Sequence, residues 1–243
     1  MSQKSKIEWT ESTWNPISGC TKISRGCDNC YAEKMAFRLQ AMGTKGYENG
    51  FEVTLHPESL EKPLKLKKPQ MIFLNSMSDI FHDKVPDAFI FEIFKVMNKA
   101  SWHTFQVLTK RPKRLEKLND KLHWSDNIWM GVTVESNDYV QRVDVLRQNC
   151  SAKVKFLSVE PLIDSVDRID YTGIDWVIVG GESGSGARIM KKEWVVDVQQ
   201  KCEKKSIPFF FKQWGGVNKK ANGRKLDGKV YDELPISNNQ ILF

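Results

Sequence analysis

From residue 71 onward, this 243-residue sequence alternates short apolar, β-prone runs with longer segments of helical periodicity. Such alternation predicts βα units and a mainly parallel sheet. We expect Pro86 in the first turn of the first of these helices and Asn137 or Asp138 as the N-cap of the third. The predicted strands are residues 71–74, 105–108, 128–134, 155–159, 176–179 and 209–212, and the predicted helices are 86–101, 111–122, 137–150 and 191–206.

The length and the 40% hydrophobic content are sufficient for one complete core. We therefore predict an α/β fold in which six or more parallel strands form a partial (β/α) barrel. A single domain is expected to span residues 1–243. It includes a cysteine loop at 19–31, which leads into a helix at 31–41, and an irregular C-terminal extension from about residue 215 to 243.

The composition of the chain indicates its cellular compartment and the kind of partner that it binds. No apolar run approaches the roughly 18 to 20 residues that cross a bilayer, and residues 1–16 lack the apolar stretch of a secretory signal. Five cysteines, three of them within eleven positions, suit metal ligands in a reducing compartment better than disulfides. We expect a cytoplasmic protein without membrane association. The net charge of +7 favours either a phosphate-rich partner or merely a basic, soluble surface.

Polar or ionisable residues follow each predicted strand. These residues lie at the carboxyl ends of the strands, and in a parallel barrel the carboxyl ends converge on the face where active sites are built. Loops between strands and helices are polar in any case, because solvent contact and helix capping require it. However, a glutamate follows each of the strand sequences GVTV, LSV and IVGG at an equivalent position. The candidate catalytic residues are Glu135, Glu160 and Lys212.

Cys20, Cys27 and Cys30 lie in the segment GCTKISRGCDNCY. Three thiolates on one loop can hold three irons of a four-iron cluster or three positions around zinc. A structural zinc site normally takes a fourth protein ligand, and none is evident near this loop. Cys150 and Cys202 fall in predicted helices and are expected to be small buried residues. The cluster is favoured over zinc, and both stay open.

The strings IEWTESTWNPISGC, NSMSD, LTKRP, GVTVE, SVEPL, GGESG and FFKQWGG, together with the cysteine loop, carry a resemblance that spans nearly the whole chain. They resemble an uncharacterised family of phage-associated and bacterial proteins with a three-cysteine motif. That family looks like a divergent branch of the radical S-adenosylmethionine enzymes. The gap of six residues between Cys20 and Cys27 is longer than the three that is usual in those enzymes.

The resemblance implies that Cys20, Cys27 and Cys30 ligate three irons of a [4Fe–4S] cluster whose fourth iron binds S-adenosylmethionine. Reductive cleavage would give a 5′-deoxyadenosyl radical that abstracts hydrogen from a substrate, with a flavodoxin or ferredoxin as electron donor. A nucleic acid or nucleotide is a possible substrate. The resemblance and the strand-end chemistry together give the candidate cofactor-binding residues Ser76, Asp79, Gly180, Gly181, Glu182 and Arg188.

Two other functions fit parts of this pattern. A non-catalytic zinc- or cluster-bearing module that binds nucleic acid would use the net charge, but it leaves the strand-end glutamates without a role. A metal-independent barrel enzyme could bind a phosphorylated small molecule at GGESGSGAR, although this segment lacks the stricter phosphate-loop signature.

Overall fold

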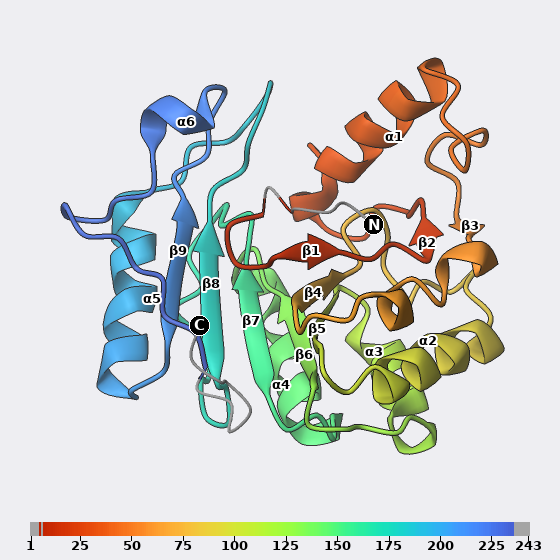
Figure 1. Cartoon of the computed structure of the whole chain (residues 1–243). Coiled ribbons are helices and arrows are strands. Elements are labelled where there is room, and N and C mark those ends of the chain that lie inside the picture. Colours follow the sequence, from red (N-terminus) through yellow and green to blue (C-terminus); the bar gives the residue numbers. More distant parts are fainter. Residues whose placement is uncertain (1–4, 6, 236–243) are drawn as a thin grey trace.

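The computed structural model describes residues 5 and 7–235, and its centre is a seven-stranded parallel sheet that curls into a partial barrel (Figure 1). The predicted α/β partial barrel is therefore confirmed. The strand order is β1-β4-β5-β6-β7-β8-β9, and every pair in it is parallel. The strands are β1 Ser12–Thr13, β4 Met71–Leu74, β5 Thr104–Thr109, β6 Ile128–Thr133, β7 Lys155–Val159, β8 Trp176–Gly180 and β9 Phe209–Gln213.

Six of these strands match the six that were predicted, and each boundary either agrees or differs by one residue. The seventh, β1, was not predicted; it adds a parallel edge beside β4 through Ser12 and Thr13. A second, two-stranded antiparallel sheet joins β2 Ile17–Ser18 to β3 Thr54–Leu55. Strand β2 of this small sheet leads directly into the cysteine loop.

The helices cover the outer face of the curled sheet, as Figure 1 shows for α2 to α5. Alternate residues of each strand, such as Ile72, Val107 and Leu157, pack in one core with residues of these helices. The helices are α1 Tyr31–Ala41, α2 Asp87–Lys99, α3 Pro112–Leu118, α4 Gln141–Asn149, α5 Lys192–Lys204 and α6 Lys219–Asn222, and 3₁₀ turns lie at Arg25–Cys27, Pro57–Ser59, Pro63–Lys65, Asn119–Lys121 and Asn137–Tyr139.

Two predicted helix starts differ from the structure. Pro86 precedes α2 as its N-cap, because its extended backbone turns the chain into the helix at Asp87. The prediction of Asn137 or Asp138 as an N-cap was wrong: the Ser136 side chain accepts from the Asp138 backbone N–H and caps a 3₁₀ turn that precedes α4.

The inner face of the partial barrel is filled by aromatic side chains. The other set of alternate strand residues forms this second core, whose buried members are Trp9, Phe73, Trp129, Phe156, Trp176, Ile178 and Phe210. Trp176 lies at its centre, with ring centroids of Trp9, Trp129 and Phe156 within about 6 Å. The aromatic layer therefore closes the barrel interior toward the amino ends of the strands.

Gly131 makes room for this layer, because a Cβ at that position would lie 2.6 Å from two ring atoms of Phe156. We expect Gly131→Ala to lower the free energy of unfolding by about 1 to 3 kcal/mol, as overpacking of a close-packed core does. Chemical denaturation measures this change. The double variant Gly131→Ala/Phe156→Leu should recover part of the loss, and strictly additive effects would contradict the assignment.

The described part of the C-terminal extension, up to residue 235, is irregular, as predicted; residues 236–243 of the predicted extension lie outside the described residues. After the four-residue helix α6 it runs back along β9, where the Phe211 backbone N–H donates to the Tyr231 carbonyl at 3.0 Å. The extension covers the outer edge of β9, which is the last strand of the sheet. None of the described helices has both the length and the apolar character that crossing a bilayer requires.

Candidate functional site

The cysteine loop lies across the carboxyl ends of the parallel strands. Gly19 starts it with a φ of +81°, and a Cβ there would lie 2.0 Å from the Glu52 carbonyl oxygen, so this turn needs glycine. The Gly19 backbone N–H donates to the Met77 carbonyl, just beyond β4. Cys27 closes a 3₁₀ turn, and Cys30 directly precedes α1. All three loop cysteines are free and partly exposed.

Below the loop, ionisable side chains continue the inward-facing rows of the strands. Each stands an even number of residues after an inward side chain of its own strand, as Glu135 does after Trp129 and Glu182 after Trp176. The period of two therefore turns them toward the same end of the barrel interior. The residues placed in this way are Lys110, Glu135, Glu160, Glu182 and Lys212.

Glu135 is the most deeply placed of these groups, with a fully buried side chain. Its carboxylate accepts from Lys110 Nζ at 2.9 Å, from Arg142 Nη1 at 2.9 Å and from Ser24 Oγ at 2.7 Å. A Cβ at Gly26 would lie 2.4 Å from Glu135 Cγ, so the loop backbone rests directly on this side chain. Glu135 thus anchors the middle of the cysteine loop to the end of β6.

A second anchor holds the start of the loop. Arg111 Nη2 donates to the carbonyl and hydroxyl oxygens of Thr21 at 3.1 and 2.9 Å, and the Thr21 hydroxyl lies 2.8 Å from His82 Nε2. Burial, together with the nearby Asp79 carboxylate and against the opposing Arg111 charge, raises the pKa of the adjacent Cys20 thiol to about 11. Without a metal, Cys20 is therefore a neutral thiol near pH 7.

A third anchor holds the end of the loop through Glu182, which lies just beyond β8. Asn29 Nδ2 donates to Glu182 Oε2 at 3.0 Å and to the Gly186 carbonyl at 2.9 Å. Arg188 donates to both carboxylate oxygens of Glu182, at 2.6 and 3.0 Å, and also to the Arg25 carbonyl at 2.8 Å. These contacts bring two of the predicted cofactor-binding residues against the turn that carries Cys27.

Glu160 and Lys212 lie across β8 from each other and form a pair of 2.6 Å between Oε1 and Nζ. Gly180 separates them, and a Cβ there would lie 3.2 Å from the Glu160 carboxyl carbon. Gly181 allows a closer approach still, because its Cβ would fall 2.0 Å from the Trp214 carbonyl oxygen. Gly181 is thus needed where β8 meets the segment after β9, and Gly180 leaves room for the Glu160 carboxylate.

Ser76 and Asp79 lie at the end of β4 and already have protein partners. Asp79 accepts from the Thr109 hydroxyl at 2.8 Å and from the backbone N–H groups of Phe81 and Lys110 at 3.0 Å each. Ser76 exchanges hydrogen bonds with the Asn15 side chain. Asp79 therefore ties β4 to the end of β5 beside Cys20.

Sequence reasoning did not identify the partners that fasten the loop. They are Thr21, Ser24, Asn29, His82 and Arg142, and Ser24 and Glu135, for example, are 111 positions apart. The one available signal was the period of two along each strand, which places Glu135 and Glu182 under the loop. The partners on the loop itself have no comparable pattern.

The cysteine loop supplies the donor set for a metal group. Within residues 5 and 7–235, no three or more His, Cys, Asp or Glu side chains converge closely enough to hold a metal ion. The three loop thiols are nevertheless free and carried by one anchored loop, with Ser24 Oγ 3.5 Å from Cys27 Sγ. Soft thiolates of this kind suit an iron–sulfur cluster or zinc, and binding either requires the three side chains to converge.

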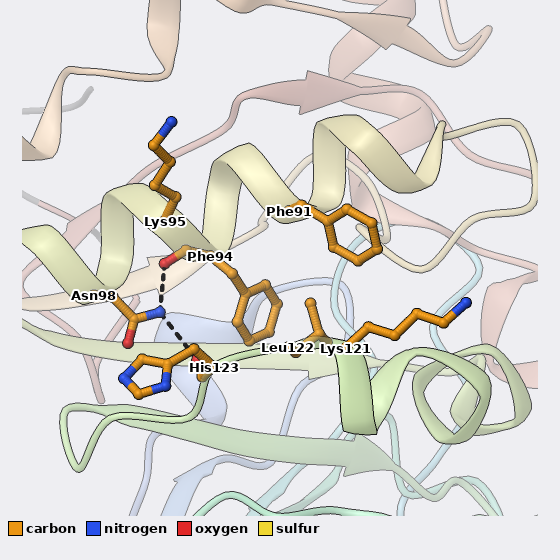
Figure 2. Close-up of a pocket in the computed structure, with 7 residues that line it drawn as sticks. All are labelled: Phe91, Phe94, Lys95, Asn98, Lys121, Leu122 and His123. Carbon is orange, nitrogen blue, oxygen red and sulfur yellow. Dashed lines mark hydrogen bonds between the residues drawn. The ribbon is translucent and has the colours of Figure 1, made fainter.

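A surface hollow elsewhere on the molecule holds none of the predicted site residues. Figure 2 shows it between α2 and residues 121–123, where Asn98 Nδ2 donates to the carbonyls of Phe94 and His123 at 2.8 and 2.9 Å. These segments lead into the amino ends of β5 and β6, away from the cysteine loop. Its lining residues are Phe91, Phe94, Lys95, Asn98, Lys121, Leu122 and His123.

The buried carboxylates predict how stability depends on pH. Burial raises the pKa of Glu135, but Lys110 and Arg142 lower it more, and Arg188 likewise outweighs burial at Glu182, so both pKa values lie below the ordinary 4.5. The stability that the ionised Glu135 and Glu182 contribute to the fold is therefore fully present above about pH 4.5. It is lost as the pH falls through their lower pKa values in the folded protein. Urea unfolding at pH values on both sides of 4.5 should show a steep loss on the acid side. Glu182→Gln should make it shallower, and a stability unchanged by acid would contradict the assignment.

Comparisons with known proteins give one family. A protein-family profile described as "Protein of unknown function (DUF5131)" matches residues 4–235, which include the cysteine loop, all seven strands of the main sheet and most of the C-terminal extension. Neither the search of curated proteins nor that of solved structures returned a match. The match therefore identifies the family of the chain, but it gives no information about the reaction or the ligands.

Proposed function

The chain belongs to the DUF5131 family of proteins of unknown function, and we propose that it is an iron–sulfur enzyme of the radical S-adenosylmethionine type. One observation carries this proposal: the only loop with several cysteines in the sequence is fastened over the carboxyl ends of a parallel partial barrel. In barrels of this kind, that end is where catalytic groups are built.

Cys20, Cys27 and Cys30 would hold three irons of a [4Fe–4S] cluster, and the fourth iron would stay open for S-adenosylmethionine. When bound and reduced, such a cluster would supply one electron for the cleavage of S-adenosylmethionine into methionine and a 5′-deoxyadenosyl radical, and that radical would take a hydrogen atom from the substrate. The electron would come from a small donor protein such as a flavodoxin or ferredoxin.

The chain's own residues would position the reactants. Arg188 combines a positive charge with a partly exposed side chain beside the cysteine loop, so we assign it to the carboxylate of S-adenosylmethionine. Glu182 fixes Arg188 in place, while Gly180 and Gly181 leave room at the end of β8. Ser76 and Asp79 are the rival group at the end of β4, where Asp79 is buried and held by the Thr109 hydroxyl, whereas Arg188 is partly exposed beside the cysteine loop.

Glu160 and Lys212 would serve the substrate. Their 2.6 Å contact pairs the Lys212 ammonium with the Glu160 carboxylate, so each charge is balanced at the ends of β7 and β9, where both side chains could hydrogen-bond to a polar substrate group. Glu135 is less suited to direct chemistry, because Lys110, Arg142 and Ser24 already occupy its oxygens. We therefore assign Glu135 to positioning the loop.

The test is metal analysis of protein purified without oxygen. Iron and sulfide near four of each per chain would support the proposal. Stoichiometric zinc without iron would overturn it in favour of a zinc-bearing binding module, and the absence of both would favour a metal-independent enzyme.

A further inference from the structure

The net charge of the chain is concentrated at one end of the barrel. Three segments meet there: residues 19–50, 182–192 and 215–227, which we call the mouth segments. They carry 12 Lys and Arg against 5 Asp and Glu, a net +7, and the rest of the chain carries 25 of each. The whole charge excess of the protein therefore lies on segments around the cysteine loop.

Hydrogen bonds and an ion pair hold the mouth segments together. Lys34 Nζ of α1 donates to the Ser185 carbonyl at 3.0 Å, and Lys192 pairs with Asp227. Figure 1 shows α1, the connection from β8 to α5, and α6 around the same end of the sheet. The charge thus belongs to one continuous end of the molecule.

Exposed apolar side chains gather on the same segments. The described residues include eight large hydrophobic side chains that are exposed, and six of them lie on the mouth segments, with Tyr31 65% and Phe37 52% exposed. Each of the six has a Lys or Arg within three positions in the sequence. They are Ile23, Tyr31, Phe37, Met42, Ile189 and Val217.

We infer that the mouth segments bind single-stranded nucleic acid, whose phosphates meet the cations while unpaired bases stack on Tyr31 and Phe37. Interleaved cations and exposed aromatic rings are how proteins hold single strands without reading their sequence. A protein partner is the weaker occupant, because eight of the twelve cations are lysines, and lysine is depleted at the cores of protein interfaces. The inference extends the proposed function by giving the enzyme a polymeric substrate, but binding itself needs no cluster.

The first test uses fluorescein-labelled single-stranded DNA and RNA of about 20 nucleotides, with binding followed by fluorescence anisotropy over a range of salt concentrations. We expect the triple variant Arg38→Glu/Lys45→Glu/Lys191→Glu to weaken binding at least about tenfold and to flatten the salt dependence. These three side chains are exposed, and none forms an ion pair with a described residue. A matched variant, Lys67→Glu/Lys68→Glu/Lys99→Glu, changes exposed cations at the other end of the barrel and should bind like the parent.

A second pair of variants separates stacking from charge. Tyr31→Ala should weaken binding about fivefold or more, because it removes a stacking ring without changing the net charge. Trp102→Ala removes an exposed ring, 40% accessible, far from the mouth segments and should leave binding unchanged. Thermal unfolding of each variant shows whether it has folded.

Absence of binding by the parent to either oligonucleotide, or equal losses in the mouth and control variants, would overturn the inference. Iron content is measured on the same preparations. Iron with no oligonucleotide binding refutes this inference alone, while binding by an iron-free protein refutes the proposed enzyme and leaves this inference standing.

Discussion

Cys27→Ala is expected to reduce the iron bound per chain from about four atoms to almost none after anaerobic reconstitution. Cys27 closes the 3₁₀ turn at the centre of the cysteine loop, so its loss leaves two separated thiols that cannot hold a four-iron cluster. The fold should survive, because Cys27 is partly exposed and the loop is anchored by other residues. Iron analysis and chemical denaturation measure the two effects.

Cys202→Ala is the matched control, since it removes the same thiol from a fully buried position in α5. It should keep the full iron content while losing up to about 1 to 2 kcal/mol of stability through the small cavity that it opens. Full iron retention by Cys27→Ala, or equal iron loss in both variants, would exclude Cys27 as a ligand.

Glu135→Ala is expected to lower the free energy of unfolding by about 3 to 5 kcal/mol, the largest stability loss among these variants. Its carboxylate is fully buried between two cations, so its removal leaves Lys110 and Arg142 without their shared partner. The loop should also loosen, because Ser24 loses its acceptor and Gly26 its support. Denaturation measures the first effect, and limited proteolysis near residue 25 measures the second.

Glu33→Ala provides the comparison, because it breaks the pair between Lys22 of the cysteine loop and Glu33 of α1, whose side chains are 46% and 28% exposed. Solvent screens such a pair, and its loss should change stability by less than about 1 kcal/mol. If Glu135→Ala and Glu33→Ala destabilise the protein equally, the account of Glu135 as an anchor is wrong.

The sequence predicted the sheet well because six of its strands are short apolar runs that alternate along the chain with segments of helical periodicity. Strand β1 was missed since Ser12 and Thr13 carry no hydrophobic signal, and they join the sheet through backbone hydrogen bonds to β4. Asn137 or Asp138 was predicted as the cap, one or two residues after the observed Ser136, because all three are good capping residues.

Some residues of the candidate site could be predicted from the sequence, and others could not. Strand-end positions such as Glu135 and Lys212 follow from the strand pattern and the topology of parallel barrels. Their partners do not, because the contacts of Ser24 with Glu135 and of Asn29 with Glu182 join residues more than 100 positions apart. Such pairs are set by tertiary packing, on which local sequence pattern carries no information.

The central claim is that the three cysteines hold a cluster with one iron open to S-adenosylmethionine. The most direct test is electron paramagnetic resonance of the dithionite-reduced protein before and after S-adenosylmethionine is added. The account predicts a reduced-cluster signal whose shape changes on the addition, because the open iron gains a ligand. A reduced-cluster signal that S-adenosylmethionine leaves unchanged, or no iron signal at all, would contradict it.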